Sequence, residues 1–186
     1  MAITIGAVIA VAALSSAEWT MTDQPDDHTF LGEYETYDVS GKVPKGYPLA
    51  GSRLGGTVTI GVIDETLIDK GTYEITVRFS QNISVPVPIF GNILISSVTK
   101  EVPAYVDKVF VIKKGEKISD LIIAGGDLKG KEEITVKGQN VTADVWVLEM
   151  FGQSALVYSA DGVIYRIEIK AMGSEIVLDR KAADTE

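Results

Sequence analysis

Short runs in which apolar and polar residues alternate follow one another from Tyr34 to the end of the chain, and this pattern favours β-structure throughout. In GTYEITVRF, residues 71–79, four large apolar residues fall on one face of an extended strand and the polar residues fall on the other. VIYRIEIKA, residues 163–171, alternates in the same way. One apolar and one polar face is typical of antiparallel strands. The sequence therefore predicts an all-β fold, an antiparallel β-sandwich or a partly open barrel with an apolar N-terminal strand extension.

Glycine-containing turn signals separate these runs, and no stretch has the spacing of a long amphipathic helix. The clearest signal is Asp161-Gly162, which lies between two alternating runs and predicts a hairpin with a type I′ turn. The run DLIIAGG, residues 120–126, is predicted as one further short strand.

The chain has 186 residues, enough for one domain that buries its own core. We divide it into an apolar segment (1–17), an acidic linker (18–33), a β-domain (34–182) and a tail (183–186). The absence of cysteine excludes disulfides and thiolate metal sites. A formal net charge of −9 argues against nucleic acid and anionic membranes as partners.

The opening run MAITIGAVIAVAAL has three interpretations. Its thirteen apolar residues from Ala2 to Leu14 are too few for a transmembrane helix, which needs roughly 20. As an export signal the run has a suitable core length and a small-residue site before Glu18, but no basic residue precedes it. As a strand, it presents bulky β-branched residues on one face and small residues on the other. Three interpretations stay open: an assembly strand, an export signal or anchor, and an internal strand of the protein's own core.

The strand interpretation predicts that this segment inserts into a groove of another subunit, with main-chain hydrogen bonds for affinity and alternate side chains for register. The residues on its predicted inserting face are Ile3, Ile5, Ala7, Ile9 and Val11.

A second apolar run, NISVPVPIFGNILI at residues 82–95, contains two prolines and is predicted to lie at a sheet margin or in a loop over the core. It is also a candidate groove or partner surface. The candidate lining residues are Ile83, Val85, Val87, Ile89, Phe90 and Ile93.

Motifs for catalysis are absent from the sequence, so we predict a protein that is not an enzyme and that needs no cofactor. The one histidine, His28, stands beside Asp23, Asp26 and Asp27, but these acids lack the spacing of a calcium loop. An exposed polar linker is the preferred interpretation, and no metal site is predicted. Asn82 and Asn140 each begin an N-glycosylation sequon.

Two parts of the chain resemble the lipoprotein-carrier-like (LolA-like) β-domains. The stretch VTADVWVLEMFGQSALVYSADGVIYRIEIKAMGSEIVLDR, residues 141–180, is similar to their closing strands. GGTVTIGVIDETLIDKGTYEITVRFS, residues 55–80, resembles their early hairpin. The resemblance implies a curved antiparallel sheet whose apolar concave face holds acyl chains or a partner. It implies no catalytic residues, and the 82–95 segment departs from the pattern.

The first functional hypothesis is a structural protein of the cell surface or extracellular space that forms a homopolymer, as pilus subunits joined by donor-strand complementation do. The second is an exported domain that binds lipid or another apolar ligand. A calcium-dependent adhesive domain is a third, weaker hypothesis.

If residues 1–17 act as an assembly strand, the protein isolated from its native source retains them. We expect an intact mass that begins at Met1 or Ala2. A mass that begins at Glu18 would identify the run as an export signal and would favour the ligand-binding hypothesis.

Overall fold

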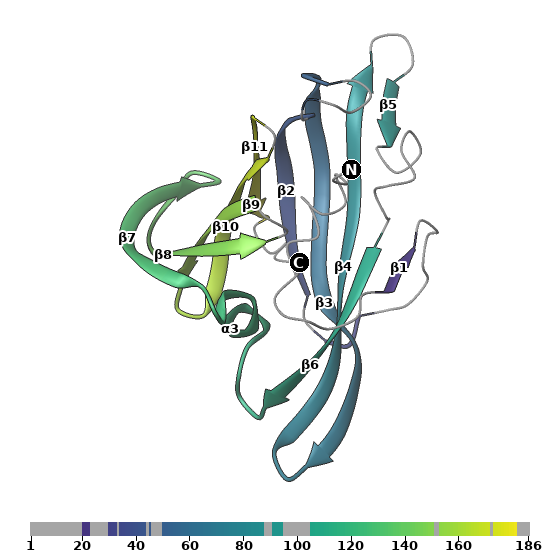
Figure 1. The fold of residues 1–186 in the computed structure, drawn as a ribbon, viewed down its shortest axis with the longest axis vertical. Coiled ribbons are helices and arrows are strands. Elements are labelled where there is room, and N and C mark those ends of the chain that lie inside the picture. Colours follow the sequence, from purple (N-terminus) through teal and green to yellow (C-terminus); the bar gives the residue numbers. More distant parts are fainter. Residues whose placement is uncertain are drawn as a thin grey trace.

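The computed structural model describes residues 20–22, 30–32, 34–43, 45, 50–87, 91–94, 105–150, 153–171 and 173–181. Within these ranges nearly every residue outside the turns belongs to a strand (Figure 1). The strands are β1 (Thr20–Thr22), β2 (Tyr34–Lys42), β3 (Arg53–Asp69), β4 (Thr72–Val87), β5 (Gly91–Leu94), β6 (Tyr105–Lys113), β7 (Asp127–Val136), β8 (Gln139–Met150), β9 (Gln153–Ala160), β10 (Val163–Ala171) and β11 (Ser174–Arg180). A helix of six residues, α3 (Ile118–Ile123), stands between β6 and β7.

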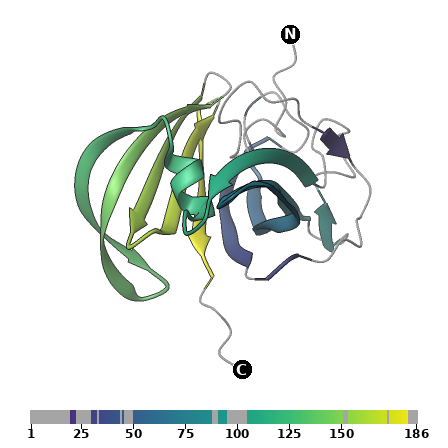
Figure 2. The same ribbon diagram turned by 90° about the horizontal axis from the view of Figure 1, so that it is seen from below.

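The described strands form one antiparallel sheet in the order β1-β6-β4-β3-β2-β11-β10-β9-β8-β7, with β5 paired to β4. The prediction of an all-β antiparallel fold is therefore confirmed. The sheet is open and strongly curled, and β2 pairs with β11 where its N-terminal and C-terminal halves join (Figures 1 and 2).

The concave face of this curled sheet carries the main core, which we call the inner core. Its buried side chains come from both halves of the sheet, because each alternating strand turns its apolar face inward. The α3 helix lies between the two halves (Figure 2) and adds Ile122 to the same cluster. The largest aliphatic side chains with less than 2 % exposure are Ile164, Ile167, Ile169, Ile176 and Leu178.

A smaller cluster, the outer core, packs on the opposite face of the C-terminal half. It joins the distal part of the β7–β8 hairpin to β9, with Ile134, Val136, Ala143, Val145 and Tyr158 as its buried members. The long hairpin therefore folds back over the sheet that it belongs to, as Figure 1 shows on the left.

The hairpin turns follow the local sequence. Asp161 and Gly162 have φ values of 53° and 72°, as a type I′ turn requires at both central residues, so the predicted hairpin is confirmed. The β7–β8 turn has the same pattern of two positive φ values, 51° at Lys137 and 81° at Gly138.

The prediction of a strand over residues 120–126 was wrong, because Ile118–Ile123 form α3. The Asp120 carboxylate accepts a hydrogen bond from the Lys117 backbone N–H (3.1 Å), which closes the first turn. The Ser119 hydroxyl donates to the Gly162 carbonyl (2.6 Å) and so anchors the helix to the β9–β10 turn. Spacing of three and four residues then brings Ile118, Leu121 and Ile122 onto the inner core.

Gly56 on β3 offers a test of this packing. Its φ is +124°, and an added Cβ would lie 2.0 Å from the Asn82 carbonyl oxygen. We expect Gly56→Ala to lower the free energy of unfolding by about 2–5 kcal/mol, from backbone strain together with overpacking. Gly130→Ala is the matched control, because Gly130 has a φ of +151° with no atom within 4 Å of the added Cβ. If urea denaturation shows that both variants lose the same free energy of unfolding, the close approach of Gly56 to the Asn82 carbonyl is contradicted.

Candidate functional site

Strand β6 lies near one margin of the sheet and is incompletely covered there. On its inner side β4 pairs with all of Tyr105–Lys113. On its outer side β1 pairs antiparallel with Tyr105, Val106 and Asp107 only. Among the residues that the structure describes, no strand pairs with Val109–Lys113 on this outer side. We call Val109–Lys113 the open edge.

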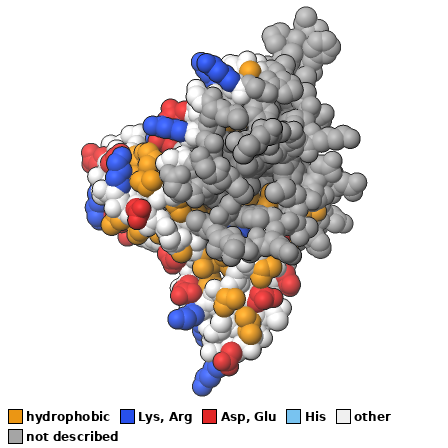
Figure 3. Space-filling model, viewed as in Figure 1, with side chains coloured by type: hydrophobic (Ala, Val, Ile, Leu, Met, Phe, Trp, Pro, Cys, Tyr) orange, Lys and Arg blue, Asp and Glu red, His pale blue; other side chains and the backbone are white. Residues whose placement is uncertain are grey.

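The open edge is apolar on both faces. Phe110 and Ile112 turn toward the inner core, and Ile112 is buried in it. Val109 and Val111 turn to the opposite face and are 48 % and 59 % exposed. In Figure 3 hydrophobic side chains show on the lower part of the molecule, where β6 and the β3–β4 hairpin lie. An apolar sheet margin with unpaired backbone groups is a template for an added strand.

The covered half of β6 is held firmly to β4. The Arg78 guanidinium donates two hydrogen bonds to the Asp107 carboxylate, at 2.6 and 2.5 Å, and lies 4.0 Å from the centre of the Tyr105 ring. Arg78 is only 4 % exposed, so this ion pair is screened little by solvent. A bidentate pair of this kind fixes orientation as well as distance. It fixes the register of β6 against β4, in which Arg78 pairs with Asp107.

Lys108 lies between Tyr105–Asp107, which β1 covers, and the open edge. Its side chain is on the inner face of the sheet. It is buried, and its ammonium group stands 5.1 Å from the centre of the Phe110 ring. Burial lowers the pKa of Lys108, because a dry environment disfavours the charged form.

A cavity of about 340 Å³ opens where β6 ends, and we call it the end cavity. Its apolar wall consists of inner-core residues from β3, β4, β6 and α3. These are Val62, Tyr73, Ile75, Ile112 and Ile118. Lysines and glutamates stand at its rim, namely Glu65, Lys113, Lys114 and Glu116. The end cavity is thus a part of the concave apolar face that the protein's described side chains leave unfilled.

The loop that follows β6 closes the end cavity on one side. The Lys114 N–H donates to the Gly71 carbonyl (2.9 Å), so the loop docks on the β3–β4 turn. The Glu116 carboxylate accepts a hydrogen bond from the Lys113 backbone N–H (2.8 Å), which holds this carboxylate at the rim.

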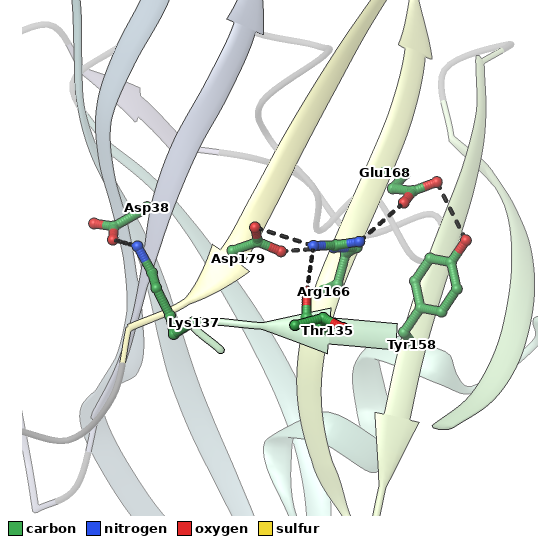
Figure 4. A network of polar contacts seen from close by, with 7 residues as sticks. All are labelled: Asp38, Thr135, Lys137, Tyr158, Arg166, Glu168 and Asp179. Carbon is green, nitrogen blue, oxygen red and sulfur yellow. Dashed lines mark hydrogen bonds and ion pairs between the residues drawn. The ribbon is translucent and has the colours of Figure 1, made fainter. Parts of the chain in front are cut away.

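A polar network on the other half of the sheet fastens the folded-back β7–β8 hairpin (Figure 4). Arg166 on β10 donates to the Asp179 carboxylate on β11 (2.6 Å) and to the Thr135 carbonyl on β7 (3.1 Å). Lys137 at the hairpin turn forms an ion pair with Asp38 on β2. These contacts make the network a structural clasp that joins four strands across the outer core.

Tyr158 completes the clasp beside the outer core. Burial first, and then the neighbouring Glu168 carboxylate, raise the pKa of Tyr158 to about 12. The Tyr158 hydroxyl donates to that carboxylate (3.2 Å), so losing its proton would remove the hydrogen bond and create a like-charge pair. Tyr37 on β2 likewise has a pKa raised by burial and by Glu35, and its hydroxyl also contacts the Ile164 carbonyl. Both tyrosines therefore act as neutral structural groups.

The structure places only some of the residues singled out in the sequence. The predicted assembly strand, residues 3–11, and the cluster of Asp23, Asp26, Asp27 and His28 lie outside the described residues. Among the rest, no group of three or more histidine, cysteine, aspartate or glutamate side chains is arranged to hold a metal ion. No helix in the described part of the chain is long and apolar enough to cross a membrane.

The 82–95 segment forms the end of β4 and the short β5, in agreement with its predicted marginal position. Ile83 and Val85 are 3 % and 0 % exposed and belong to the inner core, so they present no free surface. The Val87 backbone pairs with Gly91, and the Ile93 backbone pairs with Val85. Ile89 and Phe90 lie outside the described residues, and none of the segment's described residues lines the end cavity.

Both sequon asparagines are exposed, as glycosylation would require. Asn82 lies on β4, and Asn140 follows the β7–β8 turn, where its side-chain oxygen accepts a hydrogen bond from Thr135 (2.8 Å).

Neither the open edge nor the end cavity was predicted from the sequence. A signal for the edge was present, because KVFVIKK places large apolar residues at four consecutive positions, 109–112, instead of alternating them with polar ones. A solvated strand needs only one apolar face. The second apolar face marks a surface that another element can cover.

The raised pKa of Tyr158 predicts a loss of stability in alkali. Between about pH 10, the ordinary tyrosine value, and the folded-state pKa of about 12, the unfolded chain releases a proton that the folded chain retains. Stability is therefore full below pH 10 and falls by about 2–3 kcal/mol as the pH rises through this interval. Tyr158→Phe should reduce the fall in the free energy of unfolding that urea denaturation measures between pH 8 and 12. Tyr37 is present in both proteins, so its own contribution cancels in the comparison. Parallel curves would contradict this role of Tyr158.

No family model matches the chain, and no curated protein shows detectable sequence similarity to it.

Proposed function

We propose that this protein is a non-catalytic structural subunit of the cell surface or extracellular space, and that it polymerises by inserting its N-terminal strand beside β6 of a neighbouring copy. The observation that carries the proposal is the open edge, Val109–Lys113, which is apolar on both faces and which no described strand pairs on its outer side. Long unprotected apolar edges promote association in soluble proteins. A strand that covers this one satisfies its backbone groups and buries Val109 and Val111.

The chain itself supplies a strand of the required kind. The apolar run Ala2–Leu14 carries no charged side chain and is rich in β-branched residues. It lies shortly before β1, and β1 already pairs with β6 in the antiparallel sense. The same margin of the sheet therefore accepts strand addition from this region of the sequence.

Insertion into a neighbour is a head-to-tail contact, because the donating strand and the receiving edge are different surfaces. Such a contact builds an open filament unless its rotation closes a ring. The partner is thus a second copy of the chain, and the proposal requires no cofactor and no catalytic residue. Export would expose the sequons at Asn82 and Asn140 to glycosylation, and both side chains are exposed.

The end cavity favours a second candidate function, the binding of an apolar ligand. Its volume of about 340 Å³ lies within the range of small-molecule sites, and part of its wall is aliphatic and aromatic, with charged residues at the rim. Resemblance to lipoprotein-carrier-like domains agrees with this alternative.

Replacing Ile3, Ile5, Ile9 and Val11 together by asparagine tests the polymerisation proposal. Each buried aliphatic side chain contributes roughly 1.5–3 kcal/mol, so we expect the variant to remain a folded monomer under conditions in which the natural sequence forms filaments. Electron microscopy and sedimentation velocity measure assembly, and far-ultraviolet circular dichroism checks the fold.

The matched control replaces Ala2, Thr4, Ala10 and Ala12, on the other face of the same strand, by asparagine. It introduces the same number of amide groups and should still polymerise. Filaments of normal length from the first variant would refute the donor role.

A further inference from the structure

We infer that the end cavity receives the bulky side chains of the N-terminal strand of a second copy of the chain. This inference rests on the proposed function and adds to it the receptor site and the face of the strand that enters. The occupant is the face that carries Ile3, Ile5, Ile9 and Val11.

The end cavity adjoins the open edge at Ile112 and Lys113, which line it. Ile112 belongs both to the open edge and to the cavity wall. Its cross-strand neighbour on β4 is Tyr73, another wall residue, and Ile75 on the same strand pairs with Phe110. A strand added along β6 therefore directs every second side chain onto the face where the cavity lies.

The odd-numbered positions of the bulky residues in the N-terminal run agree with their entry on the face where the cavity lies. On β6 the even-numbered residues Val106, Lys108 and Ile112 are buried on the inner face, while odd-numbered Val109 and Val111 are exposed on the outer face. An added strand that pairs Ile9 or Val11 with Ile112 turns its odd-numbered residues to the inner face, and the β1–β6 register, in which Met21 pairs with Val106, has the same parity. The bulky residues of the N-terminal run are also odd-numbered.

The same register shows why the occupant comes from another copy. Thr20 pairs with Asp107, and continuing that pairing backward along the chain would bring Ser15 opposite Ile112 and Leu14 opposite Lys113, where β6 ends. Small or polar side chains would then face the cavity. The bulky residues from Ile3 to Val11 would lie past the end of β6. A strand from a second copy is free to adopt the register that brings Ile9 or Val11 beside Ile112.

Charge at the rim disfavours a fatty acid or phospholipid as the occupant. Lys113 and Lys114 are accompanied there by Glu65 and Glu116, so the rim has no formal excess of positive charge for an anionic headgroup. The Glu116 carboxylate is moreover held in place by the Lys113 backbone N–H. The Ala2–Leu14 run has no charged side chain, so it needs no counter-charge at the rim.

Single-cysteine variants test this placement, because the natural chain has no cysteine. Equal amounts of full-length Ile9→Cys and Lys113→Cys proteins are mixed and treated with a short bis-maleimide. We expect a covalent dimer on a denaturing gel that contains one chain of each variant, which isotope labelling of one partner confirms by mass. Ile9→Cys mixed with Lys131→Cys, on the exposed face of β7 at the other end of the sheet, is the control and should give no such dimer.

A cavity-filling variant tests the receptor independently of cysteine chemistry. Ile118→Phe enlarges a side chain that lines the end cavity, and Leu121→Phe makes the same change one turn further along α3, where the residue packs on the core without lining the cavity. We expect Ile118→Phe to reduce the pelleted polymer by about tenfold, the effect of a modest steric penalty. Leu121→Phe should leave it nearly unchanged, and circular dichroism confirms that both variants fold.

The outcomes separate this inference from the proposed function. Filaments from the natural sequence and from Ile118→Phe, with no Ile9–Lys113 cross-link, would overturn the cavity assignment and leave strand donation standing. No filaments from the natural sequence would overturn both. A double variant, Ile9→Cys with Lys113→Cys, that cross-links within one chain at high dilution would show that a chain fills its own cavity. An acyl chain in the native mass spectrum, displaced by Ile118→Phe, would identify the occupant as a lipid.

Discussion

Burial of one continuous apolar face by curling of a single open sheet is the constraint on which the rest of this structure depends. In a sheet of ten described strands in hydrogen-bonded order, with β5 paired to β4, the strands β2, β3, β4, β6 and β8–β11 turn apolar residues to the concave side, and α3 fills the space between the two halves. Curling brings residues such as Val58 and Leu178 into one cluster without a second sheet. An open sheet still has margins, and the two halves protect their margins differently.

The C-terminal half ends at β7, which no described strand pairs on its outer side, but β7 is rich in charged residues, which protect a strand edge. The β7–β8 hairpin folds back over β9 and β10, and the contacts of Arg166 and Lys137 hold it there. The N-terminal half has only the three-residue β1 on β6 among the described strands. This asymmetry is the physical basis for the proposal that an assembly site lies on β6, because an apolar strand margin without a cover is where another chain can pair.

Much of the fold follows from local sequence signals, and the functional site does not. Alternation with a period of two predicts β4 and β10, and Asp161-Gly162 predicts the type I′ turn between β9 and β10. The sequence did not predict the helix α3, because DLIIAGG is too short to show a helical period. The hydrogen bond of Ser119 to a distant turn helps to set the conformation of this segment. The end cavity depends on strands β3, β4 and β6 meeting α3, a juxtaposition that no local pattern encodes. The apolar character of 82–95 was visible, but burial of Ile83 and Val85 depends on the curl of the whole sheet.

The pairing of β2 with β11 has a consequence for how the protein forms. These strands come from opposite ends of the described chain, yet their ladder joins the two halves of the sheet. Loop closure between such distant segments is entropically costly, and folds dominated by non-local pairs form slowly. During synthesis β2 and β3 leave the ribosome long before β11 exists. One side of β2 therefore stays unpaired until β11 has been synthesised. The protein therefore passes through a stage in which its sheet has one more unpaired strand margin than the finished fold, and that stage is when pairing with the wrong partner is easiest.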